Sequence, residues 1–122
     1  METSIQSSQN ISSGNSMEEC IKECLACFQS CFGCISHCLT QGGKFAEPTH
    51  IGLMQECAEV CRTSATLMIS KGQFAFEFCQ LCATVCDACA QSCSNVDPND
   101  PMMQECADEC RKCAEACRNM SH

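Results

Sequence analysis

Apolar and thiol side chains recur every three or four residues in four segments of the chain, with polar residues between them. This spacing matches one face of an α-helix, and no segment alternates apolar and polar residues with the period of two that a half-buried strand shows. The segments therefore predict four helices, over about residues 16–40, 49–71, 73–93 and 101–120. Four helices of similar length joined by short loops favour an all-α fold. The expected architecture is an antiparallel up-down-up-down four-helix bundle with a cysteine-lined core.

Local signals place the helix ends. Ser16 followed by Glu19 is a capping-box pattern, and Gly42-Gly43 stops the helix that it opens. Asp100 is an N-cap residue and Pro101 suits the first helical position, where a missing N–H costs nothing. Residues 1–16 are rich in Ser, Asn and Gln and carry few apolar side chains, so we expect a disordered N-terminal tail before a bundle domain over 17–122.

Cysteine is the unusual component, with 17 in 122 residues. Within each predicted helix the gaps between cysteines alternate between three and four, which puts them on one stripe facing the bundle interior. The stripes are Cys20, Cys24, Cys27, Cys31, Cys34 and Cys38; Cys57 and Cys61; Cys79, Cys82, Cys86, Cys89 and Cys93; and Cys106, Cys110, Cys113 and Cys117. Cysteine alone has too little volume to fill a core at native density, so we expect another occupant between the helices.

Disulfides are a poor explanation within one helix, because Cβ atoms at i and i+4 lie about 5–6 Å apart and a disulfide needs roughly 3.5–4.5 Å. A metal ion fits better, since two metal–sulfur bonds of about 2.3 Å join sulfurs up to roughly 4.6 Å apart. Thiolates suit Cu(I), zinc and iron–sulfur clusters, while thioethers favour Cu(I). Met54 and Met103 lie three residues before a cysteine of their stripe, and His50 lies seven before one, so these three join the thiols as candidate ligands.

The chain resembles the copper storage proteins, in particular the cytosolic branch of this cysteine-rich family. The resemblance covers about residues 17–120 and rests on the Cys-rich stretches 19–27, 56–61, 79–86 and 106–120. It implies a bundle, often a homotetramer, whose core holds many Cu(I) ions per chain on cysteine thiolates, for copper storage and detoxification, with a copper chaperone or chelator for exchange. A zinc-binding thiolate reservoir and a metal-free thiol-rich regulatory protein are the alternatives. At Ser64 the stripe lacks a soft ligand, which leaves copper capacity there in doubt.

The two ends of the predicted bundle differ. One end carries His37, His50, Met54 and Met103, ligands weaker than thiolate, and we expect copper to load there. At the other end an apolar plug is expected from Leu67, Ile69, Phe74, Phe76 and Phe78. The first predicted helix also carries a second, apolar stripe, which must be covered and therefore suggests a protein interface. The stripe consists of Ile21, Leu25, Phe28, Phe32, Ile35 and Leu39.

The net charge and the N-terminal sequence bear on whether the protein binds nucleic acid and where it is located. The net charge is −8 and no basic cluster is present, so a nucleic-acid partner is not expected. No apolar stretch approaches the roughly 20 residues of a membrane span, and the first 16 residues lack a secretory signal, so we expect a cytoplasmic protein. The histidines lie near segment ends, away from the mid-helix thiols, and no nucleophile with a positioned base is predicted, so we expect no enzyme activity.

Overall fold

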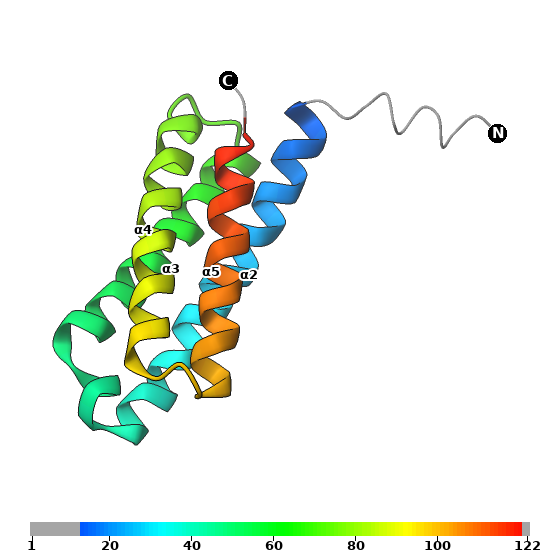
Figure 1. Ribbon diagram of the computed structural model, residues 1–122. Coiled ribbons are helices and arrows are strands. Elements are labelled where there is room, and N and C mark those ends of the chain that lie inside the picture. The colour runs from blue at the N-terminus through cyan, green and yellow to red at the C-terminus, as the bar shows by residue number, and fades with distance from the viewer. Residues whose placement is uncertain (1–12, 121–122) are drawn as a thin grey trace.

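The computed structural model describes residues 13–120, with side chains from residue 16. Over this range the chain forms four long helices and one short 3-10 turn (Figure 1). They are α2 (Ser13–Gln41), η1 (Gly43–Ala46), α3 (Pro48–Ile69), α4 (Ala75–Val96) and α5 (Pro101–Arg118). Helix α2 packs against α3 and α5, and α4 packs against the same two helices. The predicted antiparallel four-helix bundle is therefore confirmed.

The helix boundaries differ from the predicted ones mainly at the start of α2. The helix begins at Ser13, so Ser16 and Glu19 lie inside it and the predicted capping box does not open it. Met17 packs against the core, which favours extension of the helix across this region, where serine is only slightly unfavourable. Residues 13–16, which the sequence assigned to the tail, thus belong to α2, and residues 1–12 lie outside the described range. Helix α4 continues to the buried Val96, beyond the predicted end at Cys93.

The other end signals act as predicted. The Asp100 side chain accepts a hydrogen bond from the Met103 backbone N–H, with Pro101 in the first turn of α5. Gly42 and Gly43 have φ angles of 72° and 55°, left-handed values that end α2 at little steric cost. After α3 the left-handed residue is Lys71, and the N–H of Gly72 donates to the carbonyl of Leu67.

The core consists of cysteine, alanine and methionine, with one valine at its edge. Buried alanines next to the thiol stripes, such as Ala58, Ala83 and Ala107, leave little side chain between the helices and let their backbones approach. Neighbouring thiols lie 3.6–4.0 Å apart, which is contact distance for two sulfur atoms. Small alanines therefore narrow the gap between the helices that the thiols must close.

Candidate metal centre

All 17 cysteines point into the bundle. Each is buried and free, and Cys34, at 6% exposed, is the only one of them with more than traces of accessible surface. The gaps of three and four residues place successive thiols on the inward face of each helix, as predicted. The thiols of α2, α4 and α5 form long columns, whereas α3 contributes only Cys57 and Cys61. The core therefore offers a continuous column of soft sulfur ligands.

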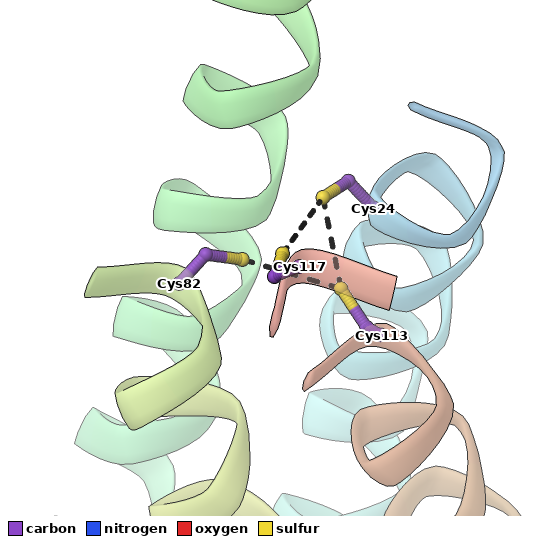
Figure 2. A group of neighbouring side chains, drawn as sticks. All are labelled: Cys24, Cys82, Cys113 and Cys117. Atoms are coloured by element: carbon purple, nitrogen blue, oxygen red, sulfur yellow. Dashed lines mark hydrogen bonds between the residues drawn. The ribbon is translucent and has the colours of Figure 1, made fainter. Parts of the chain in front are cut away.

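Thiols from all four helices gather into compact groups. In three groups, four sulfur atoms lie within 4.8 Å of one another, and Figure 2 shows the one formed by α2, α4 and α5. The groups are Cys24, Cys82, Cys113 and Cys117; Cys27, Cys61, Cys86 and Cys113; and Cys27, Cys31, Cys57 and Cys110. A group of three, Cys20, Cys79 and Cys117, extends the series. Such groups are suited to bind soft metal ions, which favour thiolate sulfur.

At one end of the column, Cys38 has three different neighbours. Its sulfur lies 3.5 Å from Nε2 of His50, 3.8 Å from Sδ of Met54 and 3.8 Å from Sδ of Met103. The sequence placed these four residues at the same end, and the fold brings their ligand atoms into contact. His50 is only 3% exposed and both methionines are fully buried, so side chains close this end and an ion that loads there must pass between them.

A surface cavity of about 370 Å³ lies beside this closed end, between α3 and α4. His50 and Ser92 both line it, and Ser92 Oγ lies 2.7 Å from Nδ1 of His50. His50 therefore separates the cavity from the Cys38 thiol, with one ring nitrogen toward each. Sequence reasoning missed Ser92, because a serine one residue before a cysteine of the stripe carries no signal of its contact with another helix.

The predicted plug at the other end is wrong in part. Ile69 and Phe74 are 61% and 59% exposed, so they do not close the bundle. The buried Met68 lies there instead, with Sδ 3.6 Å from the sulfur of Cys79, and Met120 is also buried. Two methionines, which adapt to irregular gaps, thus take the place assigned to aromatic rings.

Two polar residues of the sequence hypothesis have structural partners. Ser64 is fully buried and its hydroxyl donates to the carbonyl oxygen of Phe78, at 3.2 Å, so it satisfies a backbone group and interrupts the thiol stripe of α3. His37 lies 3.1 Å from the Asp100 carboxylate and edge-on to Phe45. It links α2 to the start of α5 outside the thiol column. His122 lies outside the described residues.

Burial sets the protonation of the closed end. It raises the pKa of the Cys38 thiol to about 11, with smaller contributions from Cys106 and Asp100. Burial also lowers the pKa of His50, which favours the neutral imidazole. At neutral pH this end therefore holds a thiol and an uncharged imidazole, and a bound metal ion must displace the thiol proton.

Comparison with known proteins gives a consistent result. The sequence profile described as copper storage protein matches residues 13–122. Nmul_A1745 of Nitrosospira multiformis has a similar structure, with a TM-score of 0.81 and 42% identity over 88% of this chain and 95% of its own. Cu(I)-bound BsCsp3 has a TM-score of 0.80 and 34% identity, over 88% and 99%. A cytosolic copper storage protein of Streptomyces lividans, loaded with five coppers, has a TM-score of 0.76 and 31% identity, over 88% and 93%.

Proposed function

Because the chain belongs to the copper storage protein family, we propose that it binds and stores multiple Cu(I) ions on the thiolates of its core. The observation that carries this function is the column of 17 buried, free cysteines with sulfur atoms in contact. Related proteins of known structure hold Cu(I) or five coppers, and they share 31–34% of their residues with this chain. Detoxification follows from the same chemistry, because an ion inside the bundle is shielded from solvent.

Charge favours Cu(I) as the stored ion. Each Cu(I) that replaces one thiol proton leaves the core electrically neutral, so filling does not accumulate buried charge. A divalent ion on four thiolates would leave two negative charges inside the bundle. Cu(I) also accepts both thiolate and thioether sulfur, and the thiol column is continued by Met54, Met68 and Met103.

Among the residues that the structure describes, one pair resembles a catalytic nucleophile and base, and the sequence alone did not reveal it. The Cys38 thiol lies 3.5 Å from the His50 imidazole, the spacing of a loose nucleophile–base pair. However, Cys38 is fully buried and its pKa is raised to about 11, the opposite of the lowered pKa of a reactive thiol. We therefore assign this pair to metal binding, in a family that stores copper.

Location and assembly complete the proposal. No helix among the described residues is long and apolar enough to cross a membrane. The Streptomyces relative is described as cytosolic, and we propose the same compartment here, with a chaperone or chelator exchanging the copper. Assembly into a homo-oligomer is supported by apolar residues of α2 that remain exposed in the single chain, Leu25, Phe32 and Leu39.

Anaerobic titration of the reduced, copper-free protein with Cu(I) under a competing chelator tests the function. Because each sulfur can serve two ions, we expect tight binding of about one Cu(I) per thiol. Parallel titration with Zn(II) should saturate at far fewer ions. Cu(I) saturation near four ions per chain would contradict a continuous store and indicate separate sites.

A further inference from the structure

The sulfur–sulfur distances within the four-thiol groups match those of a tetrahedral zinc site. In the group of Cys27, Cys31, Cys57 and Cys110, five of the six sulfur–sulfur distances lie between 3.6 and 4.0 Å. The sixth is at most 4.8 Å. The centre of a tetrahedron with such edges lies about 2.2–2.4 Å from each corner, against a Zn–S bond of about 2.3 Å. The thiols are thus arranged around a central point at zinc-bond distance.

The other two groups have similar dimensions. In the middle group, Cys61 lies 3.6 Å from Cys86 and 3.8 Å from Cys113. In the group of Figure 2, Cys24 lies 3.7 Å from Cys113 and 3.8 Å from Cys117. Each group contains four thiols and no other ligand type, which is the closed ligand set of a structural zinc site.

The three groups are not separate, because they share corners. Cys113 belongs to the first and the middle group, and Cys27 belongs to the middle and the last. Ten different cysteines therefore form three tetrahedra in a row along the bundle axis. The thiol column therefore divides into four-ligand sites, provided that two thiolates each bridge two ions.

We propose that the copper-free protein binds three Zn(II) ions in this row, joined through the bridging thiolates of Cys27 and Cys113. Binding displaces the protons of ten thiols and leaves ten thiolates around three divalent ions, a net charge of −4 for the cluster. The other seven cysteines keep their protons. Full occupation by Cu(I) is neutral, and copper binds such ligands more tightly than zinc, so copper displaces the zinc.

The bridges make a specific prediction for substitutions. A bridging cysteine serves two ions, so Cys27→Ser should reduce tight binding from three ions to one. Cys57 serves only the last group, so Cys57→Ser should leave two ions. Cys93 is equally buried but belongs to no four-thiol group, so Cys93→Ser is the matched control and should leave three. Cys113→Ser repeats the first test from the other end, with one ion left on Cys27, Cys31, Cys57 and Cys110.

The experiment uses the full reduced chain without copper, loaded with ¹¹³Cd(II), which takes the same tetrahedral thiolate sites as zinc and is visible by NMR. A chelator removes ions held by fewer than four thiolates, and circular dichroism checks that each variant is folded. We expect three cadmium resonances, the middle ion coupled to both others through sulfur, and the same count of three for Zn(II) by competition.

Three results would overturn the proposal: fewer than three tight ions in the native chain, three resonances without cadmium–cadmium coupling, or equal losses in Cys27→Ser and Cys57→Ser. If Cys27→Ser does not fold, Cys113→Ser and Cys57→Ser supply the same comparison. Because no copper is present, the result is independent of whether the protein stores Cu(I).

Discussion

The ligand atoms around Cys38 differ from those elsewhere in the core. Its sulfur contacts the imidazole of His50 and the thioethers of Met54 and Met103, whereas inner thiols mainly contact other thiols. Neutral imidazole and thioether bind Cu(I) more weakly than thiolate, so an ion held there is more easily passed on. His50 also lines the outer cavity next to Ser92. These contacts make this end the route by which we expect copper to load.

Replacing His50, Met54 and Met103 together with Leu should therefore slow Cu(I) loading several-fold. Capacity should remain nearly unchanged, because the 17 thiols are intact. Stopped-flow transfer of Cu(I) from a coloured chelator measures the rate. Met68→Leu is the matched control, since Met68 is an equally buried methionine in contact with a thiol at the opposite end. Slower transfer in the control, with an unchanged rate in the triple variant, would place loading at the Met68 end.

At the scale of the helix, α3, α4 and α5 each have one face of thiols flanked by buried alanines. In α5, the thiols alternate with the buried Ala107, Ala114 and Ala116, and the opposite face carries charged residues in i,i+3 pairs such as Arg111 with Asp108. Alanine has the highest helix propensity, and thiol and alanine surfaces bury apolar area without a metal. We therefore expect the helices to form without copper.

Copper addition should accordingly change the helix content very little. The reduced, copper-free protein should already show the far-ultraviolet circular dichroism of a predominantly helical chain, and saturation with Cu(I) should leave it nearly constant. The reason is that burial of the alanine and cysteine faces, and not metal coordination, holds the helices together. A large gain of helix on copper binding would instead show that folding is coupled to metal binding.

For the whole molecule, the buried Cys38 thiol limits the pH range over which the copper-free fold is stable. Burial raises the pKa of Cys38 from its ordinary value of 9.0 to about 11, so the folded chain retains this proton at a pH where the unfolded chain loses it. A group with a raised pKa stabilises the fold below the unfolded pKa, and this contribution is lost as the pH rises through the folded value.

The copper-free protein should therefore lose stability between about pH 9 and pH 11, by on the order of 2 kcal/mol from Cys38 alone. Chemical unfolding in urea at a series of pH values measures the loss. The Cu(I)-loaded protein is the control, because its thiolates have already given up their protons and its stability should vary less over this range. A copper-free form equally stable at pH 8 and pH 11 would contradict the assigned protonation.

The sequence alone determined the four helices and the inward thiols. Both depend on a local property, because a gap of three or four residues places two side chains on the same helix face whatever the rest of the chain does. The same holds for the Asp100 cap and the glycine stop after α2. Heptad register even placed His50, Met54 and Met103 at the end that holds Cys38.

Only the tertiary structure decided which thiols meet and what closes the ends. The corner-sharing groups around Cys27 and Cys113 depend on the axial offset and rotation of neighbouring helices, which arise from contacts between segments distant in the chain. The same offsets bury Met68 and leave Ile69 and Phe74 exposed, contrary to the predicted plug. Helix periodicity determines the direction in which a side chain points from its helix axis. The packing of the other three helices determines which residues lie in that direction.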